Sequence, residues 1–496
     1  MPTFTHPDRA EAVLAASLEE EEERADPDAR RRLLVIGDFS GRASRGVCEP
    51  LGPERRPIPV DVEDLEGQFS RLSVEVLLAR AEGTDLLLRP RSLEDFHPDR
   101  ILMREPALHE LRSIRRGLED PERFAEAAAA VRAWGAQDQT PRRESSPTVP
   151  GAAPPGTGLL EELLGTGPPS RAAEATTGDF AGFVEQIVKP HLEPAGGGEK
   201  ERLIIRADQE IGVRMRSILH DPAFQAVEAA WRGVDFLLRH LEAGEDLRVE
   251  ILDASKEELA RDLKSAKDLS DSGLYRVLVG SVRETPGAIP WTAVAGLYEF
   301  GPTVEDVALL ARLGKVAAAA DAPFLSAAAP SLMAADSFAS APDPRRWRKA
   351  EGEPAEALWG ALRRVPEARY LGLAAPRFLL RLPYGARTEP TEHFVFEEFE
   401  GAPAHQGYLW GNPSLLCLVL LESPGMLTGL PLHVYERDGE TRLQPCAETV
   451  LPLSVAEAML ERGVMPVLAL PNRDAVGIAR MQSVADPPAP LPLLGY

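Results

Sequence analysis

The chain has 496 residues, 44% of them hydrophobic and 27% charged, which is the composition of a globular protein of about three domains at ~150 residues each. Its 78 acidic residues outnumber 55 Lys and Arg, and the formal net charge of -23 argues against binding to nucleic acid or to an anionic membrane. No apolar run reaches the ~20 residues of a transmembrane helix, so we expect no membrane insertion.

The first 31 residues form an acidic arm. Five consecutive glutamates, Glu19–Glu23, follow a short stretch of helical character, and residues 1–30 carry nine acidic against three basic side chains. Such a charge run is typical of a solvated helix or tail. The arm also lacks the basic start and apolar core of a secretion signal. We therefore expect it to lie outside any core, and we expect a cytoplasmic protein.

Residues 32–134 have the pattern of a small α/β unit. The apolar run 33–36, closed by Gly37 and Asp38, predicts a buried strand that ends in a turn. Further strand or helix candidates are residues 59–65, 72–78 and 85–88. Polar residues at 92–95 predict a helix start, and apolar residues at helical spacing predict helices over 102–134.

A linker follows this unit. Residues 135–158 are rich in Pro, Gly and Ser and too polar to form a core. Directly after the linker, Leu159–Leu164 (LLEELL) places four leucines on one face of a short helix. This segment either serves as a ligand on a flexible tether or packs against its own domain, and both interpretations stay open.

Residues 159–485 form a larger region, helical to about residue 245 and mixed α/β after it. The helical period is strongest over 208–241. Strands are predicted at 247–252 and 275–282, a buried segment at 323–328, and helices at 255–264 and 304–320. Ser255 and Glu258 have the spacing of a capping box. Residues 486–496 are a proline-rich tail, unsuited to a helix or a central strand, that trails off from the domain.

The motifs of common enzyme classes are missing from the sequence. It contains no phosphate-binding P-loop, no GxGxxG, no HExxH and no histidines paired at metal-ligand spacing. The three cysteines, Cys48, Cys417 and Cys446, are widely scattered, as expected for isolated thiols in a reducing compartment. We expect no catalytic, cofactor or metal site, and therefore no enzyme.

Two short motifs can each be interpreted either as part of a binding or active site or as a structural feature. Residues 37–42 (GDFSGR) have small residues and an arginine that could hold a phosphate, but a tight turn whose glycines supply positive φ is the interpretation that we favour. Residues 410–412 (WGN) suggest an active site, but we favour a buried tryptophan beside a turn.

The same motifs carry a family resemblance. Residues 33–42 (LLVIGDFSGR), 60–66 and 91–99 (RSLEDFHPD) resemble, in this order, the small subunit of the type VI secretion contractile sheath. Residues 218–225, 231–233, 298–302, 322–324, 370–385 (YLGLAAPRFLLRLPYG) and 408–412 (YLWGN) resemble its large subunit. The chain is similar to a fusion of the two subunits, which implies a mixed α/β fold with the small unit intertwined with the larger, sheath-type domain.

The resemblance implies a non-enzymatic, structural function. In the family, the two subunits form a tight heterodimer that polymerises around an inner tube and contracts. The implied partners are other sheath subunits, the inner-tube protein, baseplate or cap proteins, and a Clp-family AAA+ unfoldase that reads a leucine-rich helix. That helix corresponds to Leu159, Leu160, Glu161, Glu162, Leu163 and Leu164. The motif residues, with an implied structural role, are Gly37, Asp38, Phe39, Ser40, Gly41, Asp95, Phe96, Trp231, Pro376, Arg377, Phe378, Pro383, Tyr384, Gly385, Trp410, Gly411 and Asn412.

The sequence departs from the family at its ends. Family members carry terminal extensions that add strands to neighbouring subunits, whereas this chain has the acidic arm and the proline-rich tail there, and the loop 421–432 looks shortened. We therefore expect both inter-subunit arms to be absent. Three hypotheses follow: a variant sheath protomer, a sheath-derived cap or baseplate adaptor that does not polymerise, or an unrelated enzyme on the same scaffold.

Overall fold

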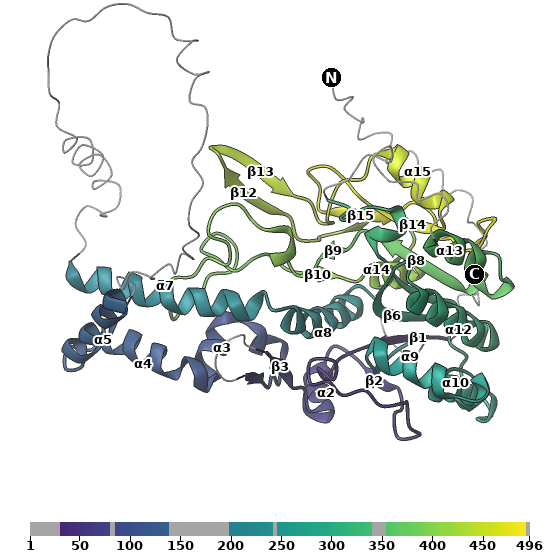
Figure 1. The fold of residues 1–496 in the computed structure, drawn as a ribbon, viewed down its shortest axis with the longest axis horizontal. Helices are drawn as coiled ribbons and strands as arrows, with labels where there is room; N and C mark the ends of the chain where they lie inside the picture. The colour runs from purple at the N-terminus through teal and green to yellow at the C-terminus, as the bar shows by residue number, and fades with distance from the viewer. Residues whose placement is uncertain (1–29, 80–84, 138–197, 242–245, 340–353, 493–496) are drawn as a thin grey trace, which may run out of the picture. The chain divides into compact units, whose positions relative to one another are not determined.

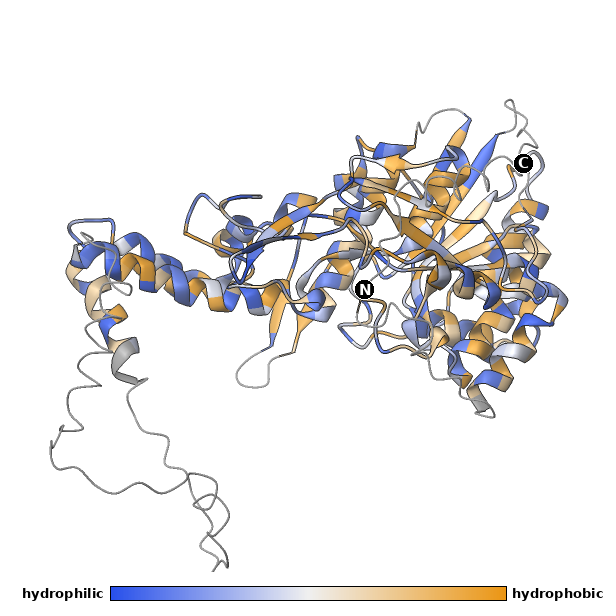
Figure 2. Ribbon diagram, turned by 90° about the horizontal axis from the view of Figure 1, so that it is seen from above, coloured by the Kyte–Doolittle hydropathy of each residue, from blue (hydrophilic) through white to orange (hydrophobic). Residues whose placement is uncertain are grey.

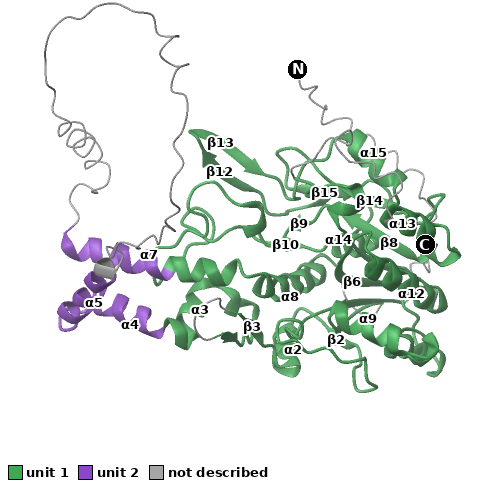
Figure 3. Ribbon diagram, viewed as in Figure 1, with its two compact units in different colours: residues 1–108, 212–496 green, residues 109–211 purple. Residues whose placement is uncertain are grey.

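The computed structural model describes residues 30–79, 85–137, 198–241, 246–339 and 354–492. The chain divides into two compact units, which Figure 3 colours separately: unit 1 is Met1–Leu108 with Gly212–Tyr496, and unit 2 is His109–Ile211. Most of the acidic arm, nearly all of the linker and the leucine-rich segment 159–164 lie outside the described residues.

A nine-stranded mixed sheet forms the centre of unit 1 (Figure 1). Its strands, in spatial order, are β11 (Leu427–Thr428), β15 (Ala475–Ile478), β14 (Val464–Ala469), β8 (Leu371–Ala375), β7 (Phe324–Ala328), β6 (Ala293–Phe300), β1 (Arg31–Gly37), β5 (Leu247–Asp253) and β2 (Ile58–Val60). The six strands from β14 to β5 are parallel, and antiparallel strands close both edges. The expected mixed α/β class is confirmed.

Strand β1 lies between strands that are more than 200 residues away in the sequence. It pairs with β5 along its whole length, from Arg31 opposite Leu247 to Gly37 opposite Asp253, and with β6 over residues 33–36. Residues 33–36 are fully buried, which explains their continuous apolar run. The predicted strand is thus confirmed, and it occupies an interior position of the sheet.

Smaller elements surround this sheet. Three two-stranded pairs are β3 (Val76–Leu78) with β4 (Leu86–Leu88), β9 (Phe378–Leu379) with β10 (Trp410–Gly411), and β12 (His433–Arg437) with β13 (Glu440–Gln444). The helices of unit 1 are α2 (Leu65–Leu72), α3 (Pro98–Arg104), α8 (Pro222–His240), α9 (Lys256–Ser265), α10 (Gly273–Tyr275), α11 (Ser281–Arg283), α12 (Val304–Ala320), α13 (Pro354–Arg363), α14 (Pro413–Glu422) and α15 (Leu453–Glu461).

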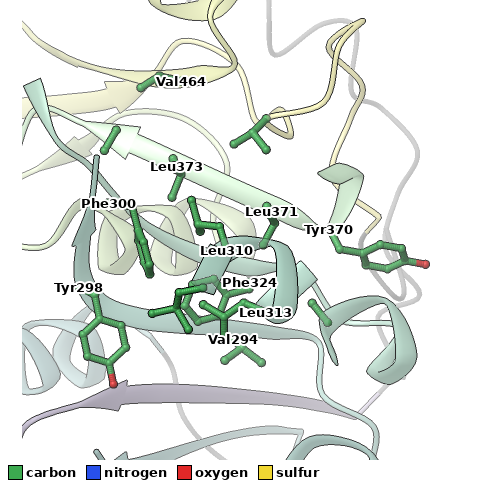
Figure 4. Packing of buried hydrophobic residues seen from close by; sticks show 14 of the residues in the cluster. Val294, Tyr298, Phe300, Leu310, Leu313, Phe324, Tyr370, Leu371, Leu373 and Val464 are labelled. Carbon is green, nitrogen blue, oxygen red and sulfur yellow. The ribbon is translucent and has the colours of Figure 1, made fainter. Parts of the chain in front are cut away.

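The core of unit 1 forms where helices cover the sheet. In Figure 4, Leu310 and Leu313 of α12 lie against Phe324 and Leu371 of the neighbouring strands. In Figure 2 the hydrophobic colour gathers on strands of the sheet, while the helices alternate between the two colours. This alternation is the amphipathic pattern of helices that bury one face.

Polar caps set several helix starts. The predicted capping box of α9 is confirmed, because the Ser255 side chain accepts from the Glu258 amide while the Glu258 side chain accepts from the Ser255 amide. Asp221 caps α8 and thereby divides the predicted helical stretch 208–241 in two. Asn412 caps α14 by accepting a hydrogen bond from the Ser414 amide.

The strand predicted at 275–282 is wrong. This segment is helical and runs through α10, a π-helical turn (η4, Arg276–Gly280) and α11. Ser272 caps it by accepting from the Tyr275 amide. A short apolar run has the same appearance in a buried helix as in a buried strand, so the sequence pattern alone could not decide between them.

Unit 2 is a small helical assembly. It contains α4 (His109–Gly117), α5 (Phe124–Gln137) and the first part of α7 (Glu199–Leu219), which continues into unit 1. Its hydrophobic core includes the buried side chains of Leu118, Ala128, Val131 and Ala207. The helices predicted over 102–134 are confirmed as α3, α4 and α5.

Within its described residues, 486–492, the proline-rich tail has no helix, as predicted, but the expectation that it trails off is wrong for residues 486–491. The Ser483 amide donates to the Ala489 carbonyl at 2.8 Å, Gln482 forms a bridge with Pro490, and Leu491 is buried. Within the described ranges, no helix has both the length and the apolar character needed to cross a membrane.

Candidate functional site: the seam between the N-terminal and C-terminal parts

The predicted motif residues of the N-terminal part, together with Trp231, lie at one surface of contact inside unit 1. We call it the seam: the contacts of residues 30–108 with residues 212–492. At the start of β1, the Arg32 guanidinium donates two hydrogen bonds to the Glu250 carboxylate, at 2.6 and 2.9 Å, and lies 3.7 Å from the centre of the Trp291 ring. A bidentate ion pair of this kind fixes direction as well as position. It therefore secures the register of β1 against β5.

The GDFSG turn at the end of β1 is held by two carboxylates. Asp253, at the end of β5, accepts from the amides of Phe39 and Ser40 at 2.8 and 3.0 Å and from the Ser40 hydroxyl at 2.6 Å. Asp38 accepts from the amides of Arg42 and Ala43. Burial raises the pKa of both carboxyls. Because carboxylates of the chain already occupy these turn amides, the geometry favours the structural turn over the phosphate-holding loop.

The two glycines of this turn have different roles. Gly41 has φ +74°, as the turn interpretation predicts, whereas Gly37 belongs to β1 and does not have positive φ. A Cβ at Gly37 would lie 3.0 Å from Leu297, so close packing is what requires glycine there.

Gly41→Ala should lower the free energy of unfolding by about 3 kcal/mol, because alanine would add left-handed strain and a steric clash. A Cβ on Gly41 would lie 2.1 Å from the Glu75 carbonyl oxygen. Gly46→Ala is the matched control, because Gly46 has φ +67° but nothing within 4 Å of the added Cβ. The control should lose only about 1 kcal/mol in urea denaturation. Equal losses in the two variants would contradict the steric account.

Glu258 and Asp262 of α9 bind the segment that follows the turn; the sequence predicted Glu258 only as part of a capping box, and it did not single out Asp262. Glu258 accepts from Arg42 Nε at 2.8 Å and from Arg55 Nη2 at 2.7 Å. Asp262 accepts from the Leu51 amide at 3.3 Å. Both carboxylates are buried. The partners in these contacts are more than 200 residues away in the sequence, so no local pattern could have predicted the contacts.

An aromatic cluster continues the seam. Trp231 of α8 donates from its indole nitrogen to the Phe39 carbonyl at 2.8 Å. Its ring is stacked on Phe69 of α2, with 3.9 Å between centroids. Phe96 lies edge-on to Phe224, 5.5 Å away, and contacts Phe69 at 6.3 Å. Three predicted motif residues, Phe39, Phe96 and Trp231, therefore belong to one buried cluster.

Residues of the RSLEDFHPD motif bridge to a distant loop. Asp95 closes its own turn by accepting from the Arg91 amide at 2.8 Å, and it forms an ion pair with Arg104. Asp99 accepts from the amides of Glu392 and His393 at 2.8 and 3.1 Å. Asp95 thus stabilises its own turn, and Asp99 makes the contact across the seam. Asp99 was not among the predicted site residues.

The LPYG motif surrounds a buried ionic cluster. Arg381 donates to Glu228 at 2.9 Å and to Glu398 at 2.8 Å, and it lies 4.2 Å from the centre of the Tyr384 ring. Pro383 and Gly385 flank Tyr384. Burial alone would raise the pKa of Glu398, but Arg381, His220 and the Tyr384 amide bring it down to about 2. Tyr384 also contacts His97, 4.9 Å away, so this cluster adjoins the seam.

The remaining motif residues lie within the C-terminal part, away from the seam. Pro376 follows a cis peptide bond, and Arg377 forms an ion pair with Glu448 at 2.7 Å. Phe378 of β9 pairs with Gly411 of β10. Trp410 is buried beside them, and Asn412 donates to the Tyr298 carbonyl at 2.8 Å. The favoured interpretation of Trp410 as a buried tryptophan is confirmed.

The arrangement of these groups is that of an interface. The carboxylates of the seam accept hydrogen bonds from guanidiniums or from backbone amides. Among the residues with assigned positions, no group of three or more His, Cys, Asp or Glu side chains could hold a metal ion. Chemically, the seam can join two chain segments tightly and in one register.

Comparison with known proteins points to one family. Residues 201–423 match the family model described as VipB: EvpB/VC_A0108, tail sheath N-terminal domain. The type VI secretion system sheath protein TssC1 of Pseudomonas aeruginosa is 33% identical over 306 residues, which cover 58% of this chain and 61% of the relative. The chain therefore spans less than two thirds of that relative. Both similarities support the interpretation of this chain as a sheath protein of a type VI secretion system. The residues matched by the family model do not include β1 or β2.

Proposed function

We propose that this chain is a structural, non-enzymatic protomer of a type VI secretion contractile sheath, in which a small-subunit-like part and a large-subunit-like part are fused. The parts are residues 32–134 and 159–485, joined by the linker 135–158. The observation that carries the proposal is the position of β1. It lies between β5 and β6, which belong to the region matched by the sheath family, although β1 itself lies outside that match.

The backbone hydrogen bonding of the sheet supports the proposal that the two parts form one protomer. Without β1, the facing edges of β5 and β6 would each present unpaired amides and carbonyls inside the core, which costs free energy. The large-subunit-like part therefore needs this strand from elsewhere. A covalent linker between the two parts supplies this strand at an effective concentration on the order of millimolar. Fusion also fixes the ratio of the two parts at one to one.

The partners follow from the sheath proposal. They are other copies or other sheath subunits, an inner-tube protein, baseplate or cap proteins, and a Clp-family AAA+ unfoldase. The cytoplasm is the compartment that this function requires. The similarity to the sheath protein TssC1 supports contacts with other sheath subunits.

Electron microscopy tests the assembly. The purified chain, mixed with its cognate inner-tube protein, should form hollow cylinders of uniform diameter. Particles that stay discrete at all protein concentrations, with and without the inner-tube protein, would contradict the sheath proposal. That outcome would favour the accessory hypothesis of a cap or baseplate adaptor.

Leu160→Ala combined with Leu164→Ala should abolish binding to the cognate unfoldase in a pull-down assay. Leu159–Leu164 carries four leucines on one helical face, the form of a peptide that docks in an apolar groove. Val184→Ala with Val188→Ala is the matched control, since these two apolar residues have the same spacing between the linker and α7. Undiminished binding of the leucine variant would remove the unfoldase from the list of partners.

A further inference from the structure

An aromatic cleft lies where strand β12 meets two loops of the C-terminal part. Its volume is about 420 Å³. His433 and Tyr435, two residues apart on β12, line it with stacked rings whose centroids are 5.6 Å apart. Phe399, Pro383 and Pro403 line it as well. The three aromatic rings are only partly buried, so the cleft offers an accessible apolar surface.

The cleft also carries polar groups that the fold does not use. Neither the Tyr435 hydroxyl nor the Arg387 guanidinium has a hydrogen-bond or ion-pair partner among the residues that the structure describes, and both can donate. The Glu436 carboxylate has no such partner there either. His433, in contrast, is held in place by the Tyr408 hydroxyl, 2.7 Å from its Nδ1. The cleft therefore combines fixed rings with free donors and one free carboxylate.

This combination suits a proline-rich peptide in the polyproline II conformation. Such a helix forms no internal hydrogen bonds, so its carbonyls need donors from outside. Its proline rings pack on aromatic side chains, and the conformation is already formed before binding. A basic residue next to the prolines would pair with Glu436.

The linker contains a segment with this chemistry. Residues 141–155 (PRRESSPTVPGAAPP) include five prolines, and Arg142 and Arg143 precede most of them. Pro147 and Pro150 are three residues apart, which places them on the same side of a helix with three residues per turn. The proline-rich tail, the other such segment of the chain, is already packed against the domain. We infer that the cleft beside β12 binds residues 141–155 of the same chain through its aromatic rings and free donors.

Helix α7 connects the end of the linker with the neighbourhood of the cleft. Arg216 of α7 donates to the carbonyl oxygen of Glu397, a residue of the cleft lining, at 3.0 Å. Glu199, at the start of the same helix, forms an ion pair with Arg132 of α5. The 17 residues between Glu199 and Arg216 correspond to about 26 Å along the helix. The linker segment has to cover a distance of this order.

The linker is long enough on both sides of the segment. From Gln137, the last residue of α5, the thirteen residues to Pro150 extend up to about 45 Å. From Pro150 to Gly198, before α7, there are 48 residues, which extend up to roughly 160 Å. A tethered segment has an effective concentration on the order of millimolar, so it prevails over the same segment of a second copy at micromolar protein. The inference does not depend on the sheath proposal.

A peptide experiment tests the cleft. A fluorescent peptide of residues 139–157 is titrated with full-length protein that carries Pro147→Ala plus Pro150→Ala, so that its own linker does not compete. Adding Tyr435→Phe plus Arg387→Ala keeps the stacked ring but removes both donors, and it should weaken binding about tenfold or more.

Two controls make this result specific. Arg437→Ala plus Arg442→Ala should leave peptide binding unchanged, since both residues are exposed on the same hairpin but outside the cleft lining. A peptide of the same composition in which no two prolines are three residues apart should bind more weakly. Equal binding by the two double variants, equal binding of the two peptides, or no binding at all would overturn the inference.

Competition separates the chain's own segment from that of a second copy. At dilutions where sedimentation shows single copies, the native chain should bind the free peptide at least about tenfold more weakly than the Pro147→Ala plus Pro150→Ala variant does. Equal affinities would contradict occupation of the cleft by the linker. Weaker binding only at concentrations where the native chain self-associates would assign the cleft to a second copy and overturn binding within one chain. None of these results bears on whether the two parts of the chain form one sheath protomer.

Discussion

Arg381→Met should lower the free energy of unfolding by about 3 to 5 kcal/mol, one of the largest effects expected for a single substitution. The side chains of Arg381, Glu228 and Glu398 are almost completely buried and form one ionic cluster. Methionine would keep much of the volume but leave two buried carboxylates without their shared cation. Urea denaturation at neutral pH measures the loss.

Two controls separate the buried charge from the loss of an arginine as such. Arg239→Met removes an exposed i,i+4 pair with Asp235 and should cost less than about 0.5 kcal/mol. Adding Glu228→Gln and Glu398→Gln to Arg381→Met should restore part of the lost stability, because the two side chains that lose Arg381 are then neutral. If the triple variant were less stable than Arg381→Met alone, the cluster would be held by packing, and the electrostatic account would be wrong.

Trp231→Ala should cost about 3 to 5 kcal/mol and loosen the N-terminal part from the rest. The substitution removes the ring stacked on Phe69 and the hydrogen bond to the Phe39 carbonyl. Limited proteolysis should then cut residues 30–108 before residues 212–492. Trp231→Phe keeps an aromatic ring but not the donor, so it should lose less stability. Proteolysis that begins in the C-terminal part would show that Trp231 does not hold the seam.

Local sequence patterns correctly predicted those helices and strands that are determined by residues close together in the sequence. The run at 33–36 was predicted as a strand because four consecutive apolar residues are followed by Gly37 and Asp38. Ser255 and Glu258 predicted the start of α9 because a capping box needs only residues three apart. The segment 275–282 was mispredicted because its apolar run fits either a buried strand or a buried helix.

Long-range contacts could not be predicted in this way. The partners of β1 begin more than 200 residues later, so periodicity near residue 33 says nothing about β5 or β6. The buried carboxylates Glu228 and Asp262 are two among 78 acidic residues, and only the fold distinguishes them from the solvated ones. Family motifs located the turn at 37–42 and Trp231, but the hydrogen bond between them emerged only from the structure.

Cleavage of the linker tests most directly whether the two parts build one protomer. A specific protease site placed within residues 138–158 leaves both parts intact after digestion. Since β1 lies inside the sheet and the seam is secured by Arg32, Asp253 and Trp231, the two fragments should elute together from a sizing column in native buffer and separate in urea. Fragments that separate in native buffer, each still folded by circular dichroism, would contradict the fused-protomer account.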